Sequence, residues 1–246
     1  MSSLVVLSIL GVSALVTSFI SGILGMAGGM ILMGVLLALL PLPAAMMLHG
    51  ISQLAANGWR ALMLWRQVDW RVIKGYTVGA AGAIALFAML QIVVSKPVAL
   101  IAMGLTPFIA LVLPEKLQLN VERRWHSSAC GLVCVTLNLT AGIAGPLLDV
   151  FFVRSAMTRQ AVVATKAATQ TLNHILKVAY FGMVIAIGDE ITPWLVAMMI
   201  ALAFVGTSLS RQVLERISDA SFRQWTRRTV MTLGVVYILG GLRLIG

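Results

Sequence analysis

The sequence predicts an all-α membrane protein made of two repeats of inverted topology, and three observations lead to this prediction. First, 60% of its 246 residues are hydrophobic and only 11% are charged, whereas soluble domains carry about 25% charged residues. Second, uncharged runs such as 4–48 and 191–210 reach or exceed the roughly 20 residues needed to cross a bilayer. Third, one order of glycines and polar residues occurs twice, 117 positions apart.

The first predicted repeat, residues 1–114, contains five apolar segments. We place them near 4–26, 29–40, 43–65, 72–94 and 97–113. The second of them would extend about 18 Å at 1.5 Å per residue, which is too short for a bilayer core of about 30 Å. We therefore expect it to form a broken or re-entrant helix pair with the segment before it, followed by three transmembrane helices.

The second predicted repeat, residues 115–246, has the same plan. Its segments lie near 124–143, 146–154, 158–186, 191–213 and 224–245, and the short one again follows a glycine-rich break. Because each repeat holds five elements, an odd number, the second must enter the membrane from the opposite side. No polar stretch is long enough for a soluble domain, so residues 1–246 form a single transmembrane domain.

The basic residues predict the same topology independently. Thirteen of the eighteen Lys and Arg fall in loops at one face of the arrangement, which places these loops inside and the N-terminus outside. Only Lys96 and Arg243 then lie outside, with the acidic turn Asp189-Glu190. Because the formal charge of +10 is confined to such loops, it records topology and does not indicate a nucleic-acid partner.

Each repeat carries a stripe of polar residues on its third segment. The two stripes are His49, Gln53, Asn57 and Arg60, and Lys166, Gln170, His174 and Lys177. Steps of four, four and three residues place all four side chains on one face of a helix. A duplicated, partly cationic stripe inside an apolar chain indicates a pathway for an anion.

The glycine-rich breaks are candidate binding elements. A helix interrupted in mid-membrane leaves backbone N–H groups that lipid cannot satisfy, and an anion at the helix N-terminus can satisfy them. Gly28, Gly29 and Gly145 would let the backbone approach a ligand closely. Pro146 fits the first turn of the following helix. Packing between helices is the alternative role of such glycines.

Lys166 is the most informative single residue of the stripes. A lysine deep in a span costs roughly 2.5 to 3.5 kcal/mol on insertion scales, so we expect it to face a cavity, with Gln53 and Gln170 as neutral donors. Arg60 and Lys177 lie closer to the predicted helix ends. We expect these two side chains to reach toward the headgroups.

His49 and Asp149 are the candidates for proton coupling. Histidine has an ordinary pKa of about 6.5, and Asp149 is the only acidic residue predicted within the membrane. A packed histidine bonded to a backbone carbonyl is the alternative reading of His49. The sequence contains no metal-binding, cofactor-binding, ATP-binding or hydrolase motif, so we expect neither an enzyme nor a bound cofactor.

Cys130 and Cys134 support a competing hypothesis, a transmembrane thiol redox carrier. They lie four residues apart on one predicted span and so share a face. Redox transfer across the membrane needs a dithiol that both sides can reach. Small packing residues are the simpler interpretation.

The order of these motifs resembles that of the sulfite exporter TauE/SafE family. The matching elements are Gly22-x-x-Gly25-x-x-Gly28-Gly29, Trp65-Arg66-Gln67-Val68-Asp69-Trp70-Arg71, Gly142-x-x-Gly145-Pro146 and Ala164-Thr165. The resemblance covers nearly the whole chain and implies a multi-pass carrier of the bacterial cytoplasmic (inner) membrane for small sulfur-containing or carboxylated anions. Two features depart from the family pattern. The Thr-Ser step near the start of each polar helix is replaced by Leu48-His49 in the first repeat and by Thr165-Lys166 in the second. In addition, no proline follows the first glycine cluster.

Together these observations predict a secondary transporter that moves a small organic or sulfur-containing anion, similar to sulfite or a sulfonate, by alternating access. Its expected partners are the anion, the lipid bilayer and, as a candidate coupling ion, the proton. The expected substrate-binding residues are Gly28, Gly29, His49, Gln53, Gly145, Pro146, Lys166 and Gln170. The sequence gives no indication of the oligomeric state.

Overall fold

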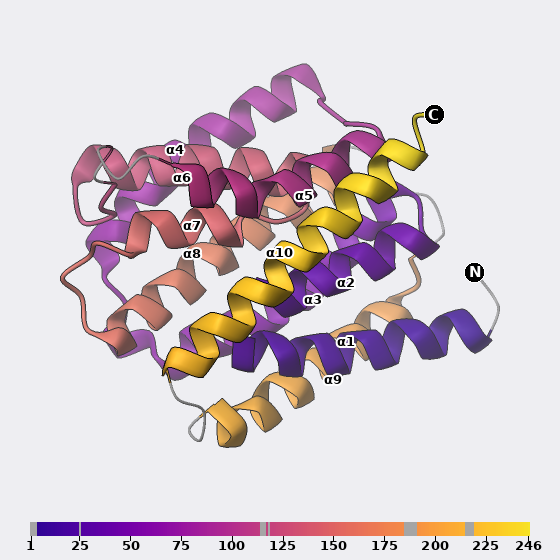
Figure 1. The fold of residues 1–246 in the computed structure, drawn as a ribbon, viewed down its shortest axis with the longest axis horizontal. Coiled ribbons are helices and arrows are strands. Elements are labelled where there is room, and N and C mark those ends of the chain that lie inside the picture. The colour runs from indigo at the N-terminus through magenta and orange to yellow at the C-terminus, as the bar shows by residue number, and fades with distance from the viewer. Residues whose placement is uncertain (1–3, 25, 114–116, 118, 185–190, 215–218) are drawn as a thin grey trace.

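The computed structural model describes residues 4–24, 26–113, 117, 119–184, 191–214 and 219–246, and the prediction of an all-α fold is confirmed for them. These residues form ten α-helices and no strand (Figure 1). The elements are α1 (Leu4–Leu24), α2 (Met26–Leu39), α3 (Leu42–Met63), η1 (Trp65–Gln67), α4 (Trp70–Leu90), α5 (Lys96–Val112), α6 (Arg124–Thr140), α7 (Gly145–Phe152), α8 (Arg159–Ala179), η3 (Tyr180–Val184), α9 (Pro193–Leu214) and α10 (Asp219–Arg243).

The two short helices, α2 and α7, each turn back along the helix before them. In the second pair, the backbone N–H of Val121 donates to Phe151 O at 2.9 Å, which holds the start of α6 beside the end of α7. In the first pair, Gly28 packs so closely on α1 that a Cβ there would lie 2.1 Å from Thr17 O. The expected helix-hairpin arrangement is therefore present at both places.

Glycines allow three pairs of helices to pack with their backbones in near contact. A Cβ at Gly206 of α9 would lie 2.4 Å from Leu15 O of α1, and one at Gly131 of α6 would lie 2.0 Å from Tyr76 O of α4. A Cβ at Gly104 of α5 would lie 2.6 Å from a carbonyl oxygen of α10. Helices α3 and α8 pack on each other and contact the first two of these pairs, α3 through α1 and α9 and α8 through α4 and α6.

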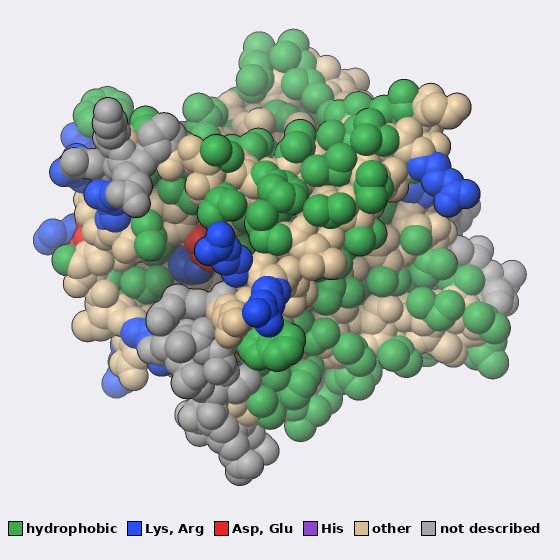
Figure 2. Space-filling model, in the orientation of Figure 1, with side chains coloured by type: hydrophobic (Ala, Val, Ile, Leu, Met, Phe, Trp, Pro, Cys, Tyr) green, Lys and Arg blue, Asp and Glu red, His purple; other side chains and the backbone are tan. Residues whose placement is uncertain are grey.

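The distribution of side chains is that of a protein surrounded by lipid. Buried positions include His49, Asn57, Thr165 and Lys177, while large apolar side chains cover the outside. Three of the described helices, α1, α4 and α9, are long and apolar enough to cross a membrane. In Figure 2 hydrophobic side chains dominate the face shown, and most of its basic side chains lie toward the end away from the two termini. The chain is a multi-pass membrane protein.

The loop before α4 is tied to α8. Asp69 caps α4, since its carboxylate accepts from the backbone N–H of Arg71 at 2.8 Å and of Val72 at 3.3 Å. The backbone N–H of Asp69 donates to Thr165 Oγ1 at 2.9 Å. The segment Val68–Arg71 therefore fixes the start of α4 against the residue that precedes Lys166.

The predicted segments agree with the helices except that α10 begins at Asp219, before the predicted 224, and that the end of α8 differs. That helix ends at Ala179 and continues as the π-helical turn η3 to Val184. The turn Asp189-Glu190 and Gly25 lie outside the described residues. Between α6 and α7, Gly142 has φ +78°, a left-handed conformation that glycine adopts without steric cost.

Candidate anion-binding site

The two polar stripes face each other across the contact between α3 and α8. A Cβ at Gly50 would lie 2.8 Å from Val178, and one at Gly58 would lie 3.8 Å from Thr171. The later residue of α3 thus contacts the earlier residue of α8, so the two helices run antiparallel. His49 therefore lies beside the end of α8, and Arg60, two residues beyond the contact of Gly58 with Thr171, lies near its middle.

Lys177 is the buried cation of the structure, and the expectation that it reaches the headgroups is wrong. Its side chain is 0% exposed. Its ammonium Nζ lies 2.8 Å from His49 Nδ1 and donates to Gly142 O at 2.9 Å. Lys177 points inward because it lies on the face of α8 that packs on α3.

The hydrogen bonds of His49 define its tautomer. Nε2 lies 3.0 Å from Gly29 O, which can only accept, so Nε2 carries the proton and donates. Nδ1 then accepts from the Lys177 ammonium, which has no acceptor of its own. The His174 ring packs edge-on against the His49 ring, with centroids 5.6 Å apart. Among the described residues, no carboxylate bonds to Lys177, so its charge is stabilised only by neutral acceptors.

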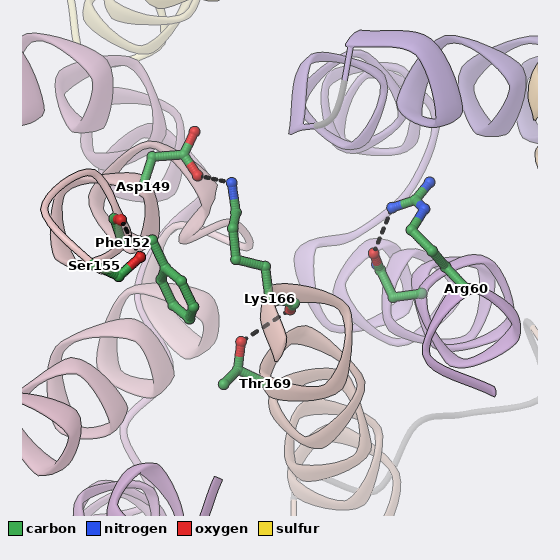
Figure 3. A network of polar contacts seen from close by, with 7 residues as sticks. Arg60, Asp149, Phe152, Ser155, Lys166 and Thr169 are labelled. Carbon is green, nitrogen blue, oxygen red and sulfur yellow. Dashed lines mark hydrogen bonds and ion pairs between the residues drawn. The ribbon is translucent and has the colours of Figure 1, made fainter. Parts of the chain in front are cut away.

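Lys166 lies nearer the surface than the sequence suggested. Its side chain is 26% exposed and forms an ion pair with Asp149 of α7 (Figure 3). Thr169 Oγ1 donates to Lys166 O at 2.9 Å, within the same helix. A half-buried lysine with an acidic partner avoids most of the insertion cost that an isolated lysine would carry.

Arg60 occupies the neighbouring helix at the same end of the stripes (Figure 3). Its guanidinium donates to Asn57 Oδ1 at 3.3 Å and to Ser21 O of α1 at 3.4 Å. Asn57 in turn donates to Gln53 O at 3.0 Å and to Gln53 Oε1 at 3.4 Å. These contacts connect the basic end of α3 to the amide of Gln53.

A small chamber of about 30 Å³ lies between α2, α3, α6, α7 and α8. It has room for about two water molecules. Its lining residues are Met26, Gly29, Met30, His49, Gln53, Asn138, Ile143, Ala144, Gly145, Pro146, Gln170, Asn173 and His174. Of the expected binding residues, the chamber brings together Gly29, His49, Gln53, Gly145, Pro146 and Gln170, while Gly28 packs on α1 and Lys166 lies outside the lining.

The starts of the two short helices meet at this chamber. Met26 is the first residue of α2 and Gly145 is the first residue of α7. A Cβ at Gly145 would lie 2.6 Å from Met26 Cβ, so glycine allows the two ends to touch. The first turn of a helix leaves its backbone N–H groups without partners inside the helix and carries a partial positive charge. Both helix ends favour a negative ligand.

Four unpaired polar atoms belong to residues that line the chamber. They are Gln53 Nε2, Asn138 Oδ1, Asn173 Oδ1 and His174 Nδ1. Neither Asn138 nor Asn173 was among the site residues predicted from the sequence. The available signal was an asparagine within an apolar segment, which has to find a hydrogen-bond partner inside the protein.

A larger groove of about 650 Å³ lies next to the chamber, between α5, α7 and α10. Its lining is mostly apolar and includes Asp149, Arg154 and Arg227. Met26 and Pro146 line both the groove and the chamber, so they form the wall between them. An apolar groove is better suited as an access route for an anion than as its binding site, because anion binding needs hydrogen-bond donors and positive charge.

Cys130 and Cys134 are both 0% exposed, and their sulfur atoms lie 3.9 Å apart. Neither is accessible from a surface. The thiol-carrier hypothesis therefore has no support in the geometry, because electron transfer between the two sides requires thiols that external partners can contact.

Comparison with known proteins gives one match. The family model described as Sulfite exporter TauE/SafE matches residues 10–238. No match was found among the curated proteins or among the solved structures. The family match covers every residue that lines the chamber.

Proposed function

Because the chain belongs to the sulfite exporter TauE/SafE family, we propose that it is a secondary transporter for a small organic or sulfur-containing anion, similar to sulfite or a sulfonate. The family is one of membrane transporters, so the expectation of a carrier instead of an enzyme agrees with it. The chamber at the starts of α2 and α7 is the proposed binding site, in the closed state of the transport cycle.

One observation carries this proposal: the buried Lys177 has hydrogen-bond partners but, among the described residues, no carboxylate. A buried charge without a counter-ion is costly, and a bound anion would compensate it. Lys177 bonds directly to His49, which lines the chamber. The positive ends of α2 and α7 add to the attraction for an anion.

The packing of the helices supports the proposal of inverted repeats, residues 1–114 and 115–246. Helix α1 packs on α9, and its counterpart α6 packs on α4. Likewise α2 packs on α10, and its counterpart α7 packs on α5. Such an exchange of equivalent contacts is expected for two halves related by a pseudo-two-fold axis.

A difference between the two ends of the stripes supports the proposal of alternating access. The offset of 117 relates His49 to Lys166 and Arg60 to Lys177. The pair His49 and Lys177 is buried and bonded, whereas its equivalent, Lys166 and Arg60, is separate, each bonded to other groups. We assign the first pair to a closed end and the second to the end nearer to opening. In this proposal Lys166 and Asp149 act at the mouth of the site.

The proposed location is the bacterial cytoplasmic (inner) membrane, with the N-terminus outside. The groove lining contains Arg154 and Arg227, which belong to the basic loops assigned to the inside. The groove would therefore connect the chamber to the cytoplasm once the wall of Met26 and Pro146 moves.

The test is uptake of labelled sulfite, sulfoacetate and acetate into proteoliposomes. Lys177→Ala should lower anion uptake roughly 10- to 100-fold, since hydrogen bonds to charged groups contribute about 1.5–3 kcal/mol. Lys74→Ala, which removes a lysine from the exposed surface, is the matched control. Uptake by Lys177→Ala equal to that of the control would contradict the assignment, and no uptake of any anion by the unaltered protein would contradict the function.

Proton coupling through His49 or Asp149 is tested in the same vesicles with an imposed pH gradient. Uptake should follow the gradient in the unaltered protein. It should become insensitive to the gradient in His49→Gln if His49 carries the proton, or in Asp149→Asn if the carboxylate does. Uptake by the unaltered protein that ignores the gradient would rule out both.

A further inference from the structure

The unpaired atoms around the chamber include acceptors as well as donors. Asn138 and Asn173 each present an unpaired amide oxygen, although their side chains are at most 3% exposed. The deprotonated oxygens of an anionic group cannot satisfy an acceptor, because they have no proton to donate. Leaving two buried acceptors unpaired is costly in the membrane interior.

The orientation of these two amides follows from their other hydrogen bonds. Asn138 Nδ2 donates to Asn173 O at 3.1 Å, and Asn173 Nδ2 donates to Cys134 O at 3.4 Å. Turning either amide over would point its oxygen at a carbonyl oxygen, which is repulsive. The two Oδ1 atoms are therefore the ones left for a ligand.

The donors of the chamber come from different elements. Gln53 on α3 has an unpaired Nε2, while its Oε1 accepts from Asn57 at 3.4 Å, which fixes the orientation of this amide too. The backbone N–H of Gly145 at the start of α7 adds a further donor, whereas Pro146 has no N–H and that of Leu148 donates to Ala144 O at 2.9 Å. The chamber thus combines donors from α3 and α7 with acceptors from α6 and α8.

We propose that the chamber selects a monoanion that carries a hydrogen-bond donor of its own, such as a hydroxyl group beside a sulfonate or carboxylate. The hydroxyl donates to Asn138 Oδ1 and Asn173 Oδ1, and the anionic oxygens accept from Gln53 Nε2 and the start of α7. The single positive charge of Lys177 balances a single negative charge. This inference rests on the proposed function and specifies the chemical class of its substrate.

The experiment compares pairs of sulfonates that differ only in the donor. Hydroxymethanesulfonate and ethanesulfonate have equal numbers of heavy atoms and equal charge, as do hydroxyethanesulfonate and propanesulfonate. A buried acceptor left unpaired costs about 1–3 kcal/mol, and sites that bond a hydroxyl reject analogues without it strongly. Uptake into proteoliposomes should favour the hydroxylated member of each pair by about 10- to 100-fold.

Asn138→Leu and Asn173→Leu remove the acceptors and keep a side chain branched at Cγ. Each should reduce the preference toward equal uptake of both members of a pair. Thr140→Val is the matched control, since the Thr140 hydroxyl bonds within its own helix α6 at 2.9 Å and does not line the chamber. The control should keep the preference of the unaltered protein.

The outcomes separate this inference from the proposed function. Uptake of both members at equal rates by the unaltered protein would overturn the inference and leave anion transport in place. A preference that persists in both leucine variants would also overturn it, because other residues would then recognise the hydroxyl. Since the first comparison uses the unaltered protein, it remains decisive even if a leucine variant does not fold.

Discussion

The adjacent glycines at 28 and 29 have different roles at the scale of the single residue. A Cβ at Gly28 would meet the backbone of α1, at 2.1 Å from Thr17 O and 2.5 Å from Ser21 N. A Cβ at Gly29 would meet only the Gln53 side chain, at 3.4 Å. Gly28 therefore serves packing, and Gly29 leaves space at the chamber.

We predict opposite results for alanine at these two positions. Gly28→Ala should destabilise the protein by about 1–3 kcal/mol, the usual cost of overpacking, and lower its melting temperature in detergent. Gly29→Ala should melt near the temperature of the unaltered protein but reduce anion uptake several-fold, because the added methyl group narrows a chamber of about 30 Å³. A normal transport rate in a well-folded Gly29→Ala would contradict this assignment.

The stripe positions show what a sequence can reveal about single residues. Spacing predicted that the stripe residues share a helix face, because the helical period determines which residues do so, and His49, Gln53 and Gln170 line one chamber. The depth of each side chain below the protein surface was predicted less well. Lys177 is buried and Lys166 lies nearer the surface, which is the reverse of the prediction. This depth depends on where neighbouring helices end and on the angles at which they cross. The spacing of residues within one helix gives neither quantity.

At the scale of helix pairs, glycines determine how closely the two helices pack. Gly131 of α6 faces the carbonyl of Tyr76 in α4, and Gly206 of α9 faces that of Leu15 in α1. Both pairs occupy equivalent places in the proposed repeats. Close backbone approach replaces the hydrophobic effect as a source of stability between helices in lipid.

We predict that Gly131→Leu and Gly206→Leu prevent stable folding, because a side chain cannot fit where a single carbon would lie 2.0 Å or 2.4 Å from a carbonyl oxygen. Gly82→Leu in α4 is the control, since a Cβ at Gly82 meets nothing within 4 Å. Folded yield after detergent extraction measures the effect. Equal yields for all three variants would show that these contacts do not hold the pairs together.

Most of the elements could be predicted because apolar runs and helix breakers are local features. The short helices α2 and α7 were expected from their length and from the glycines before them. The π-helical turn after α8 was not expected. Its conformation is set by packing among neighbouring elements, such as the hydrogen bond from Tyr180 to Ile92 O at 2.8 Å, and no local sequence pattern encodes such contacts.

At the scale of the whole molecule, the proposed topology places the basic loops inside and both termini outside. We predict that cysteines introduced at Ser95 and Gly246 react with an impermeant thiol reagent added to intact cells. A cysteine at Gln67 should react only after the cells are opened. All three positions are exposed, and the buried native Cys130 and Cys134 should give little background. Reaction at Gln67 in intact cells would reverse the orientation.

The two barriers around the chamber differ in what must break when each opens. Toward the groove, the wall consists of Met26 and Pro146, and a methionine side chain can turn about three bonds without moving the backbone. On the other side, Lys177 must give up its bonds to His49 and Gly142 while still buried. Under the proposed mechanism, an idle carrier would therefore open toward the groove far more often than toward the opposite side, a resting bias set by the unequal strength of its two barriers.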